Sequence, residues 1–183
     1  MHTNKDGTRE LWSVMEAALE TDGPEATADA GSLVRAFVHR IESYDDLPLD
    51  RELTYTTDAL PGSLVPLARV NSLAELFTMP DGSLATLERS ATALGGYGGA
   101  IYAVSEQPDG TISKSRLTTI KDIAGKQLPW VGNYEGACTG PSMAELSGDP
   151  DMPGHLVLFI ADDNFGADHQ RGTQVLAVRV LQE

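Results

Sequence analysis

Short apolar segments alternate with polar stretches rich in glycine, proline, asparagine and aspartate, a pattern typical of β-strands joined by turns. The segments predict ten strands, at residues 11–16, 33–39, 51–56, 72–78, 83–88, 100–105, 115–120, 133–138, 156–161 and 173–181. Residues 11–20 also fit an amphipathic helix, but Thr21-Asp22-Gly23-Pro24 ends such a helix early. We therefore predict a strand there and an almost wholly β protein.

Two turn motifs of the same composition lie between neighbouring predicted strands. They are Pro80-Asp81-Gly82 and Pro108-Asp109-Gly110. Proline presets the first turn angle and glycine accepts a positive φ, so both motifs predict β-hairpins. By contrast, Gly95-Gly96-Tyr97-Gly98-Gly99 lacks the Lys-Ser/Thr of a phosphate-binding loop, and we predict a flexible inter-strand loop there.

A repeat organises the predicted strands. Three apolar runs end in a carboxylate, and these carboxylates are Glu16, Glu88 and Asp162, spaced 72 and 74 residues apart. The runs belong to successive units of three, four and three predicted strands. Because four-stranded antiparallel repeats are the sequence form of β-propeller blades, we predict one all-β domain over residues 1–183, built of about three blades. A β-sandwich whose strands resemble one another by chance is the alternative.

The charge balance narrows the classes of partner. The chain has 27 acidic and 13 basic residues, a formal charge of −14, and its basic residues are scattered singly. We expect no nucleic-acid or membrane-surface partner, because an acidic protein without a basic patch is repelled by both. The acidic surplus suits a solvated surface, a basic protein partner or sites for divalent cations.

Three further features bear on location and redox chemistry. The apolar run 156–161 is far too short to span a bilayer, and the start MHTNKDGTRE lacks the apolar core of a secretory signal. Cys138 is the single cysteine, so no internal disulfide is possible. Cys138 and His169 are weak candidates for a thiol nucleophile and its general base, because a cysteine on an apolar strand usually behaves as a small hydrophobe. The histidines lack the spacing of a zinc site.

Carboxylates repeated once per blade are expected to converge at one end of a propeller. The acidic residues at such positions are Glu16, Glu88, Glu135, Asp162 and Asp163. Clustered carboxylates need a counter-charge, and a hard divalent cation, Ca²⁺ before Mg²⁺, is the simplest one. Arg89 and Arg69 are the competing counter-charges. For Glu135 and Asp162 the alternative role is hydrogen bonding within blade turns.

Several segments carry a resemblance to a known family. Asn133-Tyr134-Glu135-Gly136, then Leu156 to Phe165, then Gly172 to Ala177, resemble the closing part of the phytase-like family, also described as having esterase-like activity of phytase. Leu84 to Ser90 and Leu11 to Gly23 look like further strands of it. The resemblance covers nearly the whole chain and only the later half of the family domain. It implies half of a six-bladed propeller, in a family of bacterial type that is often exported.

The resemblance also implies an activity, hydrolysis of phosphoric or carboxylic esters, with calcium as the expected cofactor. A metal-bound water attacking the ester is the chemistry that suits a carboxylate cluster. The expected catalytic residues are Glu88, Glu135 and Asp162, the expected metal ligands Glu135, Asp162 and Asp163, and the expected substrate-binding residues Arg89, Arg69 and Asn164.

Two other functions stay open. One is a non-catalytic binding or scaffold module whose acidic face engages a basic partner, and the other is an inactive truncated family member. Half a propeller leaves blade faces and strand edges uncovered, so we also predict a homodimer that completes the ring.

Overall fold

The computed structural model describes residues 1–4, 6–43, 45–60, 68–92, 96–125, 131–162 and 172–181. Its strands are β1 His2–Thr3, β2 Arg9–Val14, β3 Leu33–Arg40, β4 Leu49–Thr56, β5 Ala68–Thr78, β6 Leu84–Thr92, β7 Tyr97–Glu106, β8 Thr111–Thr119, β9 Asn133–Ser142, β10 His155–Asp162 and β11 Gln174–Val180. Two five-residue helices, α1 Ile120–Ala124 and α2 Met143–Ser147, complete the described elements. The protein is all-β, as predicted.

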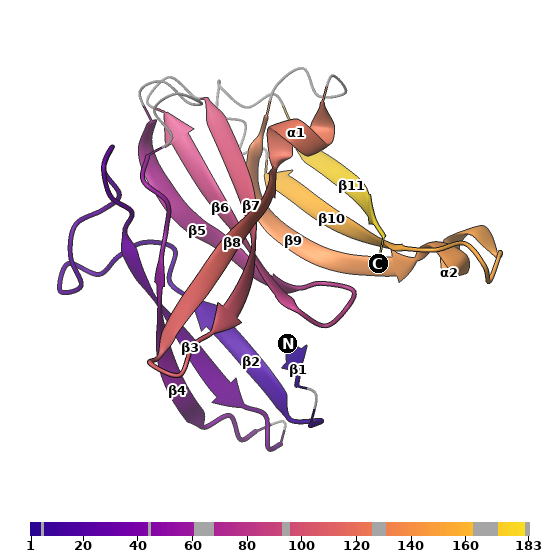
Figure 1. The fold of residues 1–183 in the computed structure, drawn as a ribbon, viewed down its shortest axis with the longest axis horizontal. Coiled ribbons are helices and arrows are strands. Elements are labelled where there is room, and N and C mark those ends of the chain that lie inside the picture. Colours follow the sequence, from indigo (N-terminus) through magenta and orange to yellow (C-terminus); the bar gives the residue numbers. More distant parts are fainter. Residues whose placement is uncertain are drawn as a thin grey trace.

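The strands form three consecutive antiparallel meanders, coloured indigo to purple, magenta to red and orange to yellow in Figure 1. These are β1–β4, β5–β8 and β9–β11. The first two share one eight-stranded sheet, because β4 pairs in parallel with β8 through Thr54–Thr111 and Tyr55–Ile112. At the far edge of that sheet, the Leu73 amide donates to the Glu16 carbonyl at 3.1 Å, so the sheet curls into a nearly closed barrel. Four-stranded blades are therefore not seen as separate sheets.

All ten predicted strands are present, with shifted ends. The first predicted strand ends at Val14, so Glu16 lies beyond it. The short strand β1 was not predicted, because two residues carry too little pattern, and the first unit therefore has four strands instead of three. The loop predicted at 95–99 is wrong for residues 97–99, which begin β7. A Cβ on Gly99 would lie 2.8 Å from Ile120, so glycine there serves close packing.

Both predicted hairpin turns are confirmed. Gly82 and Gly110 have φ angles of 83° and 82°, in the region that favours glycine. The Asp81 carboxylate accepts the Ser83 amide at 2.9 Å, and Asp109 accepts the Thr111 amide at 3.0 Å. Hydrogen bonds from the Ser83 and Thr111 hydroxyls, together with these amide bonds, hold the pKa of each aspartate below its ordinary value. The local sequence alone therefore sets these two turns.

The apolar core has two parts. One lies between the second and third meanders, where Phe77 of β5 meets Phe159 of β10 edge to face, with ring centroids 5.9 Å apart. The other lies between the first and second meanders and includes Val34, Leu53 and Ile112. Because each meander has apolar residues on alternate positions, its buried face needs a neighbouring sheet to exclude water.

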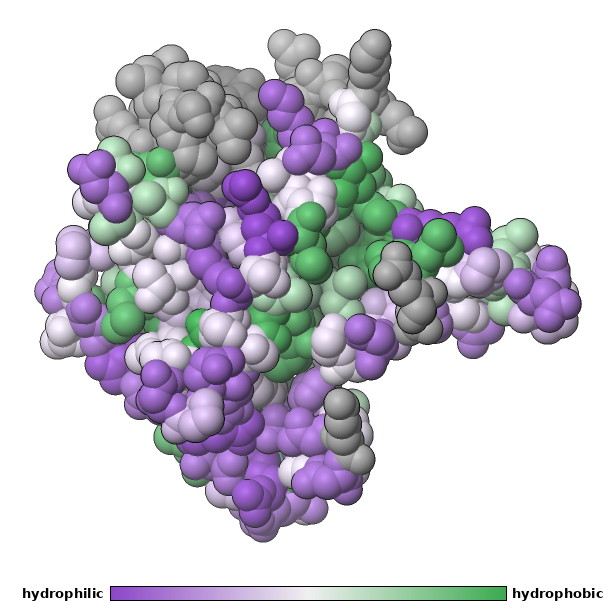
Figure 2. Space-filling view, in the orientation of Figure 1, coloured by the Kyte–Doolittle hydropathy of each residue, from purple (hydrophilic) through white to green (hydrophobic). Residues whose placement is uncertain are grey.

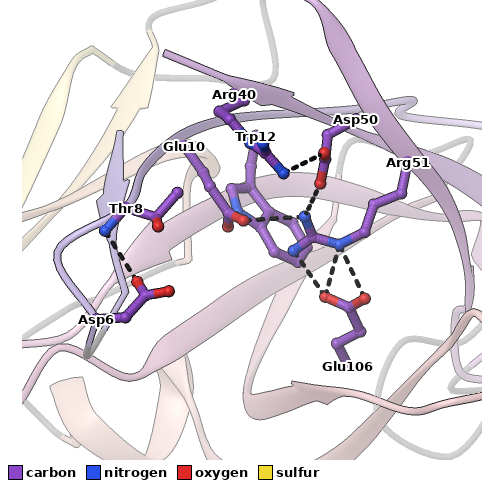
Figure 3. Close-up of polar contacts among 8 residues, drawn as sticks. All are labelled: Asp6, Thr8, Glu10, Trp12, Arg40, Asp50, Arg51 and Glu106. Carbon is purple, nitrogen blue, oxygen red and sulfur yellow. Dashed lines mark hydrogen bonds and ion pairs between the residues drawn. The ribbon is translucent and has the colours of Figure 1, made fainter. Parts of the chain in front are cut away.

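Arg51, near the start of β4, joins the first two meanders (Figure 3). Its guanidinium donates to both carboxylate oxygens of Glu106 on β7, at 2.8 to 3.0 Å, and to Glu10 on β2 at 2.9 Å. It also lies over the Trp12 ring, 5.6 Å from the centroid. Burial acts to raise the pKa of Glu10, but the bonds from Arg51 and Trp12 outweigh it, and the net pKa is lowered. The network thus adds side-chain contacts between two meanders whose β4–β8 backbone pairing spans two residue pairs.

The surface over the first meander is mostly hydrophilic, whereas hydrophobic residues gather between α1 and the third sheet (Figure 2). Exposed apolar side chains of the third sheet include Ile160 and Val175, 43% and 64% exposed. Among the described residues, no helix has the length and hydrophobicity needed to cross a membrane.

Candidate functional site

Strand β6 lies between the first meander and the third sheet and presents a different kind of residue to each. The alternation of a strand sends Ala85, Leu87 and Arg89 to one side and Thr86, Glu88 and Ser90 to the other. Ala85 and Leu87 pack into the core shared with the third sheet. The polar set is also buried, so each of its polar groups needs a hydrogen-bond partner inside the protein.

Glu88 is 1% exposed, and both of its carboxylate oxygens are occupied. One oxygen accepts the Tyr55 hydroxyl at 2.6 Å and the Lys114 ammonium at 2.5 Å. The other accepts the backbone N–H of Asp58 and the side-chain N–H of Asn71, each at 2.8 Å. These four donors come from β4, β5, β8 and the residues just after β4. The cluster therefore depends on the assembled first and second meanders.

Lys114 is the cation of this cluster. Its ammonium group also lies 2.7 Å from the Asp58 carboxylate and sits over two aromatic rings, 5.0 Å from the Tyr55 centroid and 4.6 Å from that of Tyr102. Two carboxylates thus share one ammonium in a partly dehydrated setting, where charge-assisted hydrogen bonds are strong.

Asp58 carries the more accessible carboxylate, with 45% of its side chain exposed. Partial burial acts to raise its pKa, but bonds from Lys114 and from the Tyr102 hydroxyl, at 2.6 Å, outweigh burial and hold the pKa below its ordinary value. Burial and the neighbouring Asp58 raise the pKa of Tyr102, which therefore stays a hydroxyl donor. The result is an ionised carboxylate fixed in position.

A cavity of about 810 Å³ borders this cluster. Its lining includes Asp58, Glu88 and Tyr102, together with Lys121 of α1 and Arg116 of β8, which pairs across the strands with Tyr102. A volume of this size matches the clefts in which small molecules bind. We name it the β6–β8 cavity.

On the other face of β6, Arg89 gathers a second set of polar residues. Its guanidinium donates to the Glu16 carboxylate and, at 2.8 Å, to the Asn133 side-chain oxygen. The Glu135 carboxylate lies 3.5 Å from Arg89 and accepts the Asn133 side-chain N–H at 2.6 Å. Glu16 and Glu135 are 60% and 45% exposed, so this cluster lies at the surface.

The structure brings together part of the set predicted from sequence. Glu135 meets Arg89, and the backbone of Asp162 pairs with Asn133 beside them. Glu88 lies at the same end of β6 but faces the opposite way. The side chains of Asp162 and Arg69, and all of Asp163, Asn164 and His169, lie outside the described residues. Cys138 is exposed on β9.

Among the described carboxylates, Glu88 does not fit a calcium site, and Glu16 and Glu135 would have to exchange Arg89 for the ion. Calcium requires several free oxygen ligands, yet both oxygens of Glu88 already accept protein donors, and Glu16 and Glu135 take Arg89 as their counter-charge. No three acidic, histidine or cysteine side chains in the described ranges form a group able to hold a metal.

Five residues of this cluster, Tyr55, Asp58, Asn71, Tyr102 and Lys114, were missed as site residues by sequence reasoning. Asn71 opens a repeated strand as Asn133 does, but the other four stand at no repeated carboxylate or asparagine position, and Lys114 and Asp58 are 56 residues apart in the chain. A local signal was available at Lys114, the single basic residue of the alternating segment 111–115. It stands two residues after Ile112 and therefore on the apolar side of the strand, where a charge needs a partner.

Comparison with known families agrees with this description. The family model described as phytase-like, with esterase-like activity of phytase, matches residues 1–165. The placement predicted from sequence, in the closing half of the family domain, is not supported by this match, which stops before Gly172 to Ala177. Neither a curated protein nor a solved structure matches the chain. On the family match, which covers most of its length, this chain belongs to the phytase-like family.

Proposed function

We propose that the protein hydrolyses phosphoric or carboxylic esters in the β6–β8 cavity. The observation that carries the proposal is the Asp58 carboxylate at the cavity wall, kept ionised and oriented by Lys114 and Tyr102. Family membership supports the reaction class. A fixed carboxylate next to a small-molecule cavity orients an attacking water by accepting its hydrogen bond.

In this reaction the water oxygen bonds to the phosphorus or carbonyl carbon, and the bond to the alcohol oxygen breaks. A water proton ends on the released alcohol. Asp58 is the residue that touches the water. Glu88 accepts hydrogen bonds from the Lys114 ammonium and the Asp58 backbone N–H, and so holds both in position. The predicted catalytic role of Glu88 thus becomes a positioning role in this proposal.

Purified protein assayed against phytate and an aryl carboxylic ester tests the proposal. We expect turnover of at least one, a fall of about 100-fold in kcat for Asp58→Asn, and little change for Asp151→Asn, an exposed aspartate outside the cavity. Absence of turnover with a folded wild type, or equal rates for the two variants, overturns it.

Calcium dependence rests on Asp162 and Asp163 together with Glu135, the metal ligands predicted from sequence. We propose that any calcium acts there and not at Glu88, whose oxygens are occupied. The same assay with a chelator and with added calcium tests this: Glu135→Gln is expected to weaken calcium activation, and chelator-insensitive turnover contradicts it.

The principal alternative is a binding module without catalysis. The observation in its favour is that the carboxylates of both clusters take partners within the chain, as structural groups do. A cavity ligand that binds without being turned over would establish this alternative over the hydrolase.

We further propose that the three meanders are blade-like units of a propeller, and that two copies associate through the third sheet. Three successive antiparallel meanders support the first part. Exposed Val175 and Leu181 on and just after the edge strand β11 support the second, because such edges favour pairing. Sedimentation is expected to show a dimer, and a monodisperse 19.5 kDa monomer at micromolar concentration overturns it.

A further inference from the structure

Two cationic side chains of the β6–β8 cavity differ from most of the other described Lys and Arg residues. Arg35, Arg40, Arg51, Arg89 and Lys114 all form ion pairs. The side chains of Arg116 and Lys121 form neither a hydrogen bond nor an ion pair with any described residue, although the chain carries 27 acidic residues. Both line the cavity.

The acidic side chains of the cavity wall are already engaged. Glu88 and Asp58 share Lys114, and Asp122 accepts the Thr119 hydroxyl at 2.6 Å. Among the described residues of the cavity wall, the cationic donors without an ion pair are therefore those of Arg116 and Lys121. A ligand that fills the cavity satisfies them by bringing acceptors, and a guanidinium and an ammonium bind anionic acceptors most strongly.

We infer that Arg116 and Lys121 form an anion-binding site, which holds a carboxylate or phosphate group of the ligand in the β6–β8 cavity. The inference rests on the proposed function only in placing the substrate in this cavity. It assigns specificity to two residues outside the cluster that orients the water. Arg116 pairs across the strands with Tyr102, whose hydroxyl donates to Asp58, so an anionic group bound at Arg116 lies near the carboxylate that orients the water.

Calorimetric titration of the full chain with inorganic phosphate, and separately with succinate, tests the inference. We expect saturable binding of at least one anion, weakened by added salt because the contact is ionic. The double variant Arg116→Gln/Lys121→Gln is expected to raise the Kd about tenfold or more, because it removes two charged donors. Both side chains are exposed, so the variant is expected to unfold at the same temperature as wild type.

Arg9→Gln is the matched control, because Arg9 is also exposed, has no ion pair with a described residue and lies outside the cavity. Binding by phosphate alone or by succinate alone identifies which anion the site prefers. Absence of binding by both, or equal loss in the control, overturns the inference. Anion binding without ester turnover leaves the inference standing and removes the proposed hydrolase. Turnover of a neutral ester without anion binding supports the proposed hydrolase and overturns the inference.

Discussion

The two faces of β6 near its end hold carboxylates in opposite ways. On one face Glu88 is 1% exposed and accepts hydrogen bonds from four donors, one of which is the Lys114 ammonium group. On the other, Arg89 faces Glu16 and Glu135, which are about half exposed. Neighbouring residues of one strand thus enter settings of very different dielectric. Burial, more than the number of contacts, decides how much each ion pair matters.

The strongest test of this contrast removes the cation of the buried cluster. Lys114→Met leaves Glu88 without its counter-charge in the interior, and we expect a loss of about 3–5 kcal/mol in the free energy of unfolding. Urea denaturation measures it. Lys121→Met is the matched control, because Lys121 is an exposed lysine with no described ion pair, and a change within about 0.5 kcal/mol is expected. A similarly small effect for Lys114→Met would show that Glu88 does not depend on Lys114 as its counter-charge.

A pair of tyrosines sharpens the comparison at the level of one hydroxyl. Tyr55 and Tyr134 are both buried, but the Tyr55 hydroxyl donates to Glu88 whereas the Tyr134 hydroxyl has no partner among the described residues. We expect Tyr55→Phe to cost about 1.5–3 kcal/mol, as for a hydrogen bond to a charged group, and Tyr134→Phe to be neutral or stabilising. Equal effects in thermal unfolding would contradict the assignment.

Acid stability is expected to follow Asp58. Its pKa is lowered in the folded protein, so the stability it contributes is present above the unfolded value near 3.8 and is lost as the pH falls through the lower folded value. Asp58→Asn is expected to flatten the loss of stability below about pH 4. Unfolding followed from pH 2 to 6 measures it, and an unchanged slope would place the effect on other groups.

Glu75 on β5 is expected to change stability with pH in the opposite direction to Asp58. Burial raises its pKa from 4.5, so the folded state loses stability as the pH rises through this range and the carboxyl ionises. We expect Glu75→Gln to be more stable than wild type at pH 7 and equal to it at pH 3. A variant less stable than wild type at both pH values would show that the carboxylate itself is needed.

The smallest effect is expected on the exposed side of β6. Glu135→Gln weakens one contact of Arg89 and is expected to cost about 0.2–1 kcal/mol, decreasing further in high salt. A loss as large as that of Lys114→Met would show that the Arg89 cluster is more deeply shielded from water than its exposure indicates.

The sequence by itself determined the local elements of this protein. Alternation of apolar and polar residues located all ten predicted strands, and Pro80-Asp81-Gly82 set its turn, because strand pleat and turn dihedrals depend on near neighbours.

Tertiary structure alone decided which of these groups meet. Nothing local to Thr54 or Thr111 specifies that β4 pairs in parallel with β8, and that pairing is what carries Tyr55 and Asp58 to Glu88 and Lys114. Whether Glu88 or Arg89 faces the cavity likewise depends on the register of β6 between two sheets, since a slip of one residue exchanges the faces. Long-range packing fixes that register, because burying Leu87 against the third sheet turns Glu88 toward the donors that satisfy it.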